Sequence, residues 1–422
     1  MRELPLADVL EVLIDHRGRT PKKLGGDFVV NGVPVISALL VKRGRLHISE
    51  ARRISHDMYR KWMPIPVREN DVVLTSEAPL GRCALVRSGD PIALGQRVFG
   101  LRSKPEVMDG RFLFYALQSD LIQERLYGRS SGTTVLGIRQ KELVKIRVPV
   151  PDLPQQIAVA EVLGALDDKI ALNERISRTV SELTRAVMAE LWGKAGVTSL
   201  VRGDAGVPGG WRRTTLGVLC ATGGGAIQTG PFGSQLHASD YVDPGIPSVM
   251  PQNIGDNRIA EDGIARITVA DAERLSKYRL MEGDIVYSRR GDVKRRALVR
   301  KYEDGWLCGT GCLRVRVGTA TEPLFMSYYL GEPEIQEWVA QHAVGATMPN
   351  LNTAILGEVP VVLPPADTVR QVNERLSGLD ATAAHLQHEN RTLSELRDTL
   401  LPQLLSGKIR VKDAVRTVEE AV

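Results

Sequence analysis

Two stretches of this chain are dense in arginine and lysine, the side chains that pair with phosphate groups. Both amino acids neutralise phosphates along a nucleic acid, and arginine can also bind a guanine edge through two parallel hydrogen bonds. A run of basic residues also occurs on ordinary solvated surfaces, so charge alone leaves both interpretations open. The basic residues are Lys42, Arg43, Arg45, Arg52, Arg53, Arg60 and Lys61 in the first stretch, and Arg289, Arg290, Lys294, Arg295, Arg296, Arg300 and Lys301 in the second.

Polar loops next to predicted strands supply further side chains that could bind DNA. The loops are "SEAPLGR" at 76–82 and "RRGDVKRR" at 289–296. Asparagine, glutamine and arginine carry the paired donors and acceptors that match base edges. The segments "GTT" at 132–134 and "GAT" at 345–347 lead into similar polar residues, although they are also compatible with a simple turn before a strand. We predict DNA contacts for Lys42, Arg43, Arg45, Arg60, Lys61, Ser76, Arg82, Thr133, Thr134, Arg139, Gln140, Gln252, Asn253, Ser288, Arg289, Arg290, Lys294, Arg295, Arg296, Thr347, Asn350 and Asn352.

An internal repeat explains why such loops occur twice. The stretch "SGTTVLGIRQKELVKIRVPVP", which begins at residue 131, has a counterpart 213 positions later, "VGATMPNLNTAILGEVPVVLPP". The same offset relates "DVVLT" at 71–75 to "DIVYS" at 284–288. Short apolar runs divided by Gly, Pro and Asp indicate two copies of a strand-rich mixed domain. Because the strands match while the loops differ, two copies that bind bases would read different half-sites.

Each copy ends in a long predicted helix, which starts after "VPDLP" or "LPPAD". An apolar stripe at steps of three or four residues continues along each helix, which is typical of a coiled-coil seam. We expect the two helices to run antiparallel and bury each other; two amphipathic helices on separate cores are the alternative. The stripe positions are Val159, Leu163, Leu166, Ile170, Asn173, Ile176, Val180, Leu183, Val187 and Leu191, and then Val372, Leu376, Leu379, Ala383, Leu386, Glu389, Leu393, Leu396, Leu400 and Leu404.

Four residues break these helical patterns. Asn173 interrupts the first stripe and Glu389 the second, and either could fix the helix register or simply be tolerated. Pro402 should distort or end the second helix, and Gly407 should stop it. A helix of about 39 residues is about 58 Å long, or roughly 17 base pairs of DNA, so the pair could act as a spacer.

The distribution of charge favours a polyanionic partner for the two domains. The helices hold six acidic and four basic side chains over residues 154–192, and the same numbers over residues 366–405. The whole chain has a net charge of +5, which leaves an excess of about +9 on the rest of it. The start of the chain lacks a signal-peptide pattern and no apolar run could span a membrane, so the sequence predicts a cytoplasmic protein.

No motif predicts a catalytic, cofactor or metal site. The chain has no GxxxxGK[ST] loop, no GxGxxG after a strand, and no Asn-Pro-Pro-aromatic tetrapeptide of an adenine methyltransferase. The four cysteines form no CxxC pair. His385 and His388 lie three residues apart, but this spacing is more common on an exposed helix face than in a metal site. The residues alone therefore offer no candidate for a catalytic site.

Three stretches carry a resemblance to a known family: "GIPSVMPQNI" at 245–254, "GATMPNLNTAILGEVPVVLPP" at 345–365, and "LLPQLLSGKIRV" at 400–411. With weaker echoes in the first copy, "GVPVISALLV" and "LWGKAGV", the chain resembles the specificity subunits of type I restriction-modification systems. The first copy departs from the pattern after "GVPVI", since it lacks a counterpart of the polar "QNI".

The resemblance implies an α+β fold in which two target-recognition domains alternate with two long antiparallel coiled-coil helices around a pseudo-twofold. The expected segments are domain 1 at 1–152, spacer helix 1 at 153–194, domain 2 at 195–365, spacer helix 2 at 366–406 and a tail at 407–422.

The resemblance also implies a function without an active site in this chain. Its target would be double-stranded DNA, read as two specific halves around a fixed gap. The helices would dock two modification subunits, which methylate adenine N6 with S-adenosylmethionine, and restriction or translocase subunits could join them. Two alternatives are a DNA-binding defence or architectural protein that uses the repeat without a methyltransferase, and a nuclease with unrecognised carboxylates.

Overall fold

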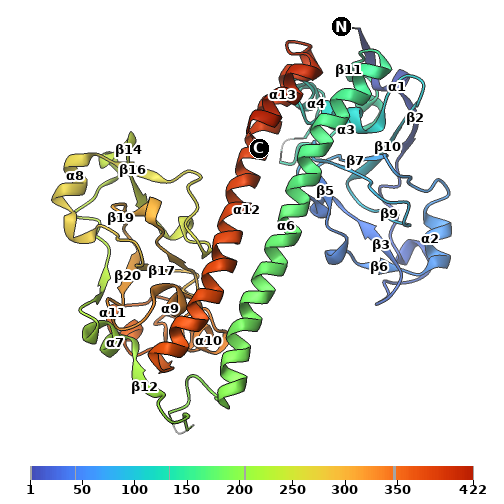
Figure 1. Ribbon diagram of the computed structural model, residues 1–422. Helices are drawn as coiled ribbons and strands as arrows, with labels where there is room; N and C mark the ends of the chain where they lie inside the picture. Colours follow the sequence, from blue (N-terminus) through green and yellow to red (C-terminus); the bar gives the residue numbers. More distant parts are fainter. Residues whose placement is uncertain (1, 43, 133, 204–205, 346–347, 422) are drawn as a thin grey trace. The chain divides into compact units, whose positions relative to one another are not determined.

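The computed structural model describes residues 2–42, 44–132, 134–203, 206–345 and 348–421 (Figure 1). The chain packs as two compact units, one formed by residues 1–175 together with 386–422 and the other by residues 176–385. Each unit holds one copy of the sequence repeat with part of each long helix. No helix among the described residues has the length and apolar character needed to cross a membrane.

The first unit is a mixed domain of short strands and helices. Its strands form sheets of order β2-β10-β7-β8, β6-β3-β9, β1-β11 and β4-β5. The strands are β1 (Glu3–Pro5), β2 (Leu10–Ile14), β3 (Val33–Ile36), β4 (Val41–Lys42), β5 (Arg45–Leu46), β6 (Arg53–Ile54), β7 (Val72–Thr75), β8 (Cys83–Leu85), β9 (Ala93–Leu94), β10 (Val98–Ser103) and β11 (Arg147–Pro149). The helices are α1 (Leu6–Val9), α2 (His56–Trp62), α3 (Gly110–Gln118), α4 (Asp120–Gly128) and α5 (Gln140–Leu143), with 3-10 turns η1 (Lys22–Leu24), η2 (Ala38–Leu40) and η3 (Ile48–Glu50).

The second unit repeats this plan. Its sheets have the order β13-β20-β17-β18-β15, β16-β14-β19 and β12-β21. The strands are β12 (Arg212–Thr215), β13 (Ala226–Thr229), β14 (Tyr241–Val249), β15 (Asp256–Asn257), β16 (Ala265–Ile267), β17 (Ile285–Ser288), β18 (Arg296–Leu298), β19 (Leu307–Cys308), β20 (Cys312–Arg316) and β21 (Pro360–Leu363). The helices are α7 (Leu216–Thr222), α8 (Val269–Arg274), α9 (Pro323–Tyr329), α10 (Pro333–His342) and α11 (Thr353–Gly357), with 3-10 turns η4 (Ala238–Asp240), η5 (Pro251–Asn253), η6 (Ser276–Tyr278) and η7 (Lys301–Glu303).

A buried ion pair marks the matched strands in both units. Asp71 precedes β7 and accepts two hydrogen bonds from Arg102 of β10, at 2.9 and 2.7 Å. Asp284 precedes β17 and accepts two bonds of 2.7 Å from Arg316 of β20. The residues between these pairs, β7 and β17, are completely buried strands. The predicted repeat of a strand-rich mixed domain is therefore confirmed at the level of single contacts.

Two long helices, α6 (Leu153–Ala195) and α12 (Ala366–Ser406), take part in both units and run side by side in Figure 1. The Asp152 side chain accepts a hydrogen bond from the main chain of Gln155, so it satisfies a free donor at the start of α6. In the first unit the early part of α6 shares a core with the late part of α12. In the second unit the late part of α6 shares a core with the early part of α12. The predicted antiparallel packing is confirmed, and each helix also closes the core of a domain.

The predicted seam is correct for most of its length and wrong at two positions of α6. Ile176 is 37% exposed and Leu183 is 50% exposed, while Thr184, Met188 and Trp192 are buried in the last part of the helix. A straight helix has 3.6 residues per turn and drifts away from a stripe that repeats every 3.5 residues. The buried face therefore moves one residue along the sequence toward the C-terminal end of α6.

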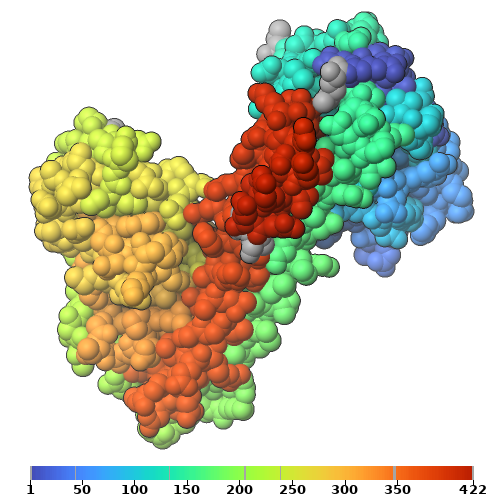
Figure 2. All heavy atoms as spheres, turned by 45° about the horizontal axis from the view of Figure 1, so that its top comes forward, coloured from blue at the N-terminus to red at the C-terminus, as the bar shows by residue number. Residues whose placement is uncertain are grey.

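Pro402 does not end the second helix, because α12 continues to Ser406 with this proline inside it. Gly407 follows with a left-handed backbone (φ 71°), as expected for a helix stop. A further helix, α13 (Val411–Ala421), then packs with the first unit, where Ala414 is completely buried. Figure 2 shows this C-terminal segment in red against the green start of α6.

Candidate nucleic-acid interface

Two loops that are distant in sequence lie together in the first unit. The main chain of Glu77, in the loop after β7, forms a bridge with Gly137, in the segment before α5. Ile138 N donates to Ser76 O at 2.9 Å, and Gly137 and Ser131 exchange two main-chain hydrogen bonds. We call residues 76–82 with 131–139 the first loop pair. Both of its halves were predicted to contact DNA, and the structure brings them together.

The second unit has the same arrangement at the positions 213 residues later. Arg290 forms a main-chain bridge with Asn350, and Leu351 N donates to Arg289 O at 2.8 Å. Gly291 N donates to Pro349 O at 3.1 Å. We call residues 289–296 with 344–352 the second loop pair. The shared main-chain contacts show that both loop pairs are part of the repeated scaffold.

The side chains of the two loop pairs differ in charge. Glu77 of the first pair forms a 3.3 Å ion pair with Arg97, a residue that the sequence analysis did not select. Arg290 takes the place of Glu77 in the second pair and is exposed, with Arg289 partly buried beside it. Arg97 has a left-handed backbone (φ 65°) next to the loop, and no sequence pattern marks such a position. The second loop pair is consequently the more basic of the two.

Several predicted contact residues lie at the surface. Arg60, Lys61, Arg82, Thr134, Arg139, Gln140, Gln252, Arg290 and Asn352 are exposed, and Lys42, Arg289, Lys294, Arg295 and Asn350 are partly exposed. Some of them already pair with carboxylates: Lys42 with Glu50 at 3.0 Å, Lys294 with Glu337 at 3.1 Å, and Arg60 with Asp57. The Lys42 ammonium holds the pKa of Glu50 below its ordinary value. Exposed pairs of this kind contribute little to folding and can be exchanged for a phosphate.

Other predicted contact residues are buried, and their bonds are internal. Ser76, Asn253 and Ser288 are each 1% exposed and Arg296 is 5% exposed. The Asn253 side chain bonds to the main chain of Met250 and of Ala260 within its own turn. The Ser288 hydroxyl donates to Arg290 O at 2.9 Å. These buried side chains stabilise the loops through internal contacts. A pattern of polar residues in the sequence does not reveal that they are buried. Arg43, Thr133 and Thr347 lie outside the described residues.

Asn352 has a local structural role, because its Oδ1 accepts the main-chain hydrogen bond of Ile355 at 2.8 Å and caps α11. This cap positions the start of a helix directly after the second loop pair.

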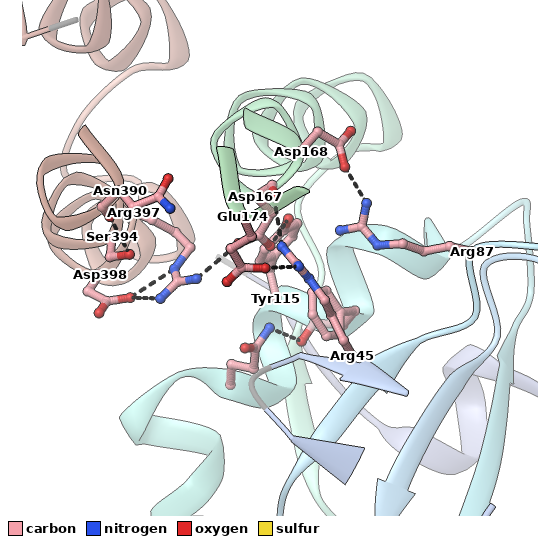
Figure 3. Close-up of polar contacts among 12 residues, drawn as sticks. Arg45, Arg87, Tyr115, Asp167, Asp168, Glu174, Asn390, Ser394, Arg397 and Asp398 are labelled. Atoms are coloured by element: carbon pink, nitrogen blue, oxygen red, sulfur yellow. Dashed lines mark hydrogen bonds and ion pairs between the residues drawn. The ribbon is translucent and has the colours of Figure 1, made fainter. Parts of the chain in front are cut away.

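Arg45 belongs to a polar cluster that joins the first domain to the long helices (Figure 3). It donates to the main-chain oxygen of Asp167 at 3.2 Å and to Glu174 at 2.6 Å, both on α6. The Asp167 carboxylate also accepts hydrogen bonds from Tyr115 at 2.8 Å and from Arg397 of α12 at 2.9 Å. Burial and the neighbouring Asp167 raise the pKa of Tyr115 above its ordinary value, so this phenol stays a donor. Asp167 thus connects α3, α6 and α12 within the first unit.

The second unit has an equivalent cluster around Asp380 of α12. Its Oδ1 accepts hydrogen bonds from Tyr328 at 2.9 Å, from Arg300 at 2.7 Å and from Arg258 at 3.3 Å. The counterpart of Arg397 is Thr184, whose hydroxyl donates to the Val180 main-chain oxygen on its own helix at 2.9 Å. The repeat offset would have located Asp167, Asp380 and their tyrosine partners, but none of them belongs to a recognisable binding motif.

The described residues contain no group of three or more His, Cys, Asp or Glu side chains that could hold a metal ion. All four cysteines are buried and unpaired by disulfides, and burial raises the pKa of Cys83 and Cys308 to about 12. Thiols of this kind are poor nucleophiles and pack as small apolar groups.

Comparison with known proteins agrees with this architecture. A family model described as the type I restriction modification DNA specificity domain matches residues 1–182 and 238–395. The chain is 23% identical over 363 residues to the type I restriction enzyme MjaVIII specificity subunit of Methanocaldococcus jannaschii, which covers 83% of this chain and 81% of that protein. It is 21% identical over 350 residues to the MjaIX specificity subunit of the same organism, or 81% of this chain and 78% of the relative.

A crystal structure of the type I restriction-modification S subunit from M. genitalium has the same fold, with a TM-score of 0.63 at 18% identity over 96% of this chain and 95% of that one. The family model covers most of this chain and matches it in two segments, one in each copy of the repeat. The chain therefore belongs to the family of type I restriction-modification DNA specificity proteins and carries two copies of the recognition module.

Proposed function

We propose that the chain recognises a bipartite DNA sequence, with one loop pair reading each half. The observation that carries this proposal is a main-chain bridge that both copies of the repeat share. It joins Glu77 to Gly137 in the first copy and Arg290 to Asn350 in the second, so the side chains at these positions differ. A shared scaffold keeps each loop pair in the same place in its domain. Different side chains on that scaffold are what two different half-sites require.

The long helices would provide the docking surface for two modification subunits. The exposed large apolar side chains of α6 include Leu172 at 42%, Ile176 at 37% and Leu183 at 50%. Their spacing places them on one side of the helix, since steps of four and seven residues return to nearly the same angle. An apolar row on a helix that has already buried its other face supports a protein partner.

The modification subunits would supply S-adenosylmethionine and methylate adenine N6, while this chain supplies the sequence specificity. Restriction or translocase subunits could join the same assembly. A cytoplasmic location would give the complex access to DNA.

A genome-wide map of N6-methyladenine tests this proposal directly. The source strain is compared with a strain in which the gene is deleted. We expect a split motif of two specific halves to lose methylation in the deletion strain. If no motif changes, a purified sample is used to select DNA from a random library; recovery of a single undivided motif, or of none, would refute bipartite recognition.

The helix length is expected to set the gap between the halves. Removing one heptad from each helix, residues 174–180 and 382–388, keeps Asn173, Glu389 and Asp380. It shortens each helix by about 10 Å, or up to about three base pairs of DNA. The selected motif should keep both halves and have a narrower gap. A gap of unchanged width would show that the helices are not the spacer.

A further inference from the structure

A cavity of about 580 Å³ lies in the second unit, between β15, β18, the α9–α10 connection and the two long helices. Its lining includes Asn257, Arg296, Glu332, Asp380 and Thr184. The volume is in the usual range for small-molecule sites. Of these side chains, the sequence predicted a contact for Arg296 alone. Arg296 is buried, whereas Arg290 of the second loop pair lies at the surface.

Arg296 is a buried cation that forms no ion pair among the described residues, although its charge acts on the nearby Glu332 carboxyl, where it opposes the effect of burial on the pKa. It is 5% exposed, and its Nε donates to Ser327 O at 2.7 Å. Within the described residues, no carboxylate lies in ion-pair distance of its two terminal nitrogens. Asn257 beside it is also 5% exposed and has a buried Oδ1 without a hydrogen-bond partner. Buried polar groups of this kind are costly unless a partner completes them.

The first unit fills the corresponding place with apolar groups. Positions 213 residues earlier hold Gly44, Cys83 and Phe114 in place of Asn257, Arg296 and Ser327. Phe114 is 1% exposed, and the Cys83 thiol contacts its main-chain oxygen at 3.8 Å, as Arg296 Nε does with Ser327. A Cβ added to Gly44 would lie 3.1 Å from the Phe114 ring. The second copy therefore has polar side chains at three positions where the first copy has small or apolar ones.

The opposite wall of the cavity differs in the same direction. In the first unit Arg397 extends from α12 to the Asp167 carboxylate. In the second unit the equivalent position is the short Thr184, and the hydrogen bonds that described side chains donate to the Asp380 carboxylate all end at Oδ1. The space that a long side chain occupies in one copy thus remains open in the other.

We propose that this cavity binds a small organic anion. Its phosphate or carboxylate group lies on the terminal nitrogens of Arg296, next to the Asn257 side chain. A guanidinium offers two parallel donors that match either anion. The lining also holds Arg185, Arg258 and the carboxylates of Asp256, Glu332 and Asp380. Arg258 pairs with Asp380, and burial raises the pKa of Glu332 to about 7, so this carboxyl is about half protonated near neutral pH.

The test is calorimetric titration of the full chain with inorganic phosphate, a sugar phosphate and citrate, alongside thermal melts. We expect one site per chain, and a loss of affinity of about tenfold to a hundredfold in Arg296→Met, since one charge-assisted contact is removed. Arg295→Met is the matched control on the neighbouring residue and should bind as the wild type does. A second variant, Thr184→Arg, places into the cavity the side chain that the first copy has there; it should fold and no longer bind.

Two further outcomes would contradict the proposal. Binding that persists in both Arg296→Met and Thr184→Arg would place the anion elsewhere, and no binding of any of the three probes would refute a small-anion site. A competition with an unrelated DNA duplex separates a free anion from a backbone phosphate: the small anion should stay bound, and its displacement by the duplex would identify the cavity as a DNA contact.

Discussion

Asn173 of α6 donates a 2.7 Å hydrogen bond to Glu389 of α12. These are the two residues that interrupt the apolar stripes of the long helices, and the structure pairs them with each other. Asn173 is completely buried, and Lys169 forms a further ion pair of 3.1 Å with Glu389. A polar contact inside an apolar seam can specify one register over others. This contact favours that interpretation over mere tolerance.

Replacing only one member of this pair should be more harmful than replacing both. Asn173→Leu removes the donor to Glu389 and should lower the free energy of unfolding by about 1–3 kcal/mol. The double variant with Glu389→Leu should recover most of this loss, because apolar groups often replace a buried polar pair without cost. Denaturant unfolding of the four proteins gives the coupling, expected at about 0.5–3 kcal/mol. Additive effects would mean that the contact has no energetic role.

The second loop pair should read one half of the DNA target. Replacing Arg289 and Arg290 with alanine is expected to relax specificity at one half only, each lost base contact costing about 1–3 kcal/mol. DNA selection with the purified variant measures this, and Lys22→Ala, an exposed lysine of the other unit that was not predicted to contact DNA, is the control. An equal loss on all sequences would instead identify the two arginines as phosphate contacts.

The exposed apolar row of α6 should be needed for assembly with the modification subunit. Leu172→Glu and Leu183→Glu place charges where an apolar partner would pack, so co-purification of the two proteins should be lost. The melting temperature should change little, since both side chains are already about half exposed. Ser181→Glu, at an exposed position of the same helix, is the control. Leu163→Glu would not serve, because Leu163 is buried. Assembly with both leucine variants intact would exclude this face as the docking surface.

The two repeated ion pairs should differ in their contribution to stability. The Arg102 side chain is 9% exposed next to Asp71, whereas Arg316 is 26% exposed next to Asp284. Arg102→Ala leaves a buried carboxylate without its partner and should cost about 3–5 kcal/mol. Arg316→Ala should cost less, because water reaches its site. Thermal melts compare the two variants, and equal losses would show that this difference in burial is unimportant.

Glu332 should make the second unit less stable as the pH rises. Burial raises its pKa from 4.5 to about 7, so the folded chain keeps a proton that the unfolded chain loses over this interval. Its contribution to stability therefore falls between pH 4.5 and 7. Glu332→Gln does not titrate, so its melting temperature relative to the wild type should rise from pH 5 to pH 8.

Glu337→Gln, on the helix α10 that begins directly after Glu332, is the matched control for the pH dependence. Hydrogen bonds from Lys294 and Gln341 lower the pKa of Glu337, so it stabilises the fold above its unfolded-state pKa and loses this effect as the pH falls. The melting temperature of this variant should therefore be lower than that of the wild type at high pH, and the difference should shrink at low pH. The same trend in both variants would contradict the assignment for Glu332.

The sequence by itself determined the repeat, the mixed strand-rich domains, the two long helices and the family. These features depend on local periodicity and on a repeat offset of 213 residues, both of which are present in the sequence itself. The apolar stripes also predicted the antiparallel helix pair, because two long seams in one chain must be buried somewhere.

Only the tertiary structure decided which polar residues are free to contact a ligand. Arg296 and Arg290 are both arginines in the same basic stretch, yet one lies inside the domain and the other on its surface. Burial depends on contacts between residues far apart in the chain, such as Arg296 with Ser327 and Asn173 with Glu389. The apolar stripe likewise does not reveal that the buried face of a straight helix shifts gradually around the helix along its length. This shift leaves Leu183 exposed and Thr184 buried.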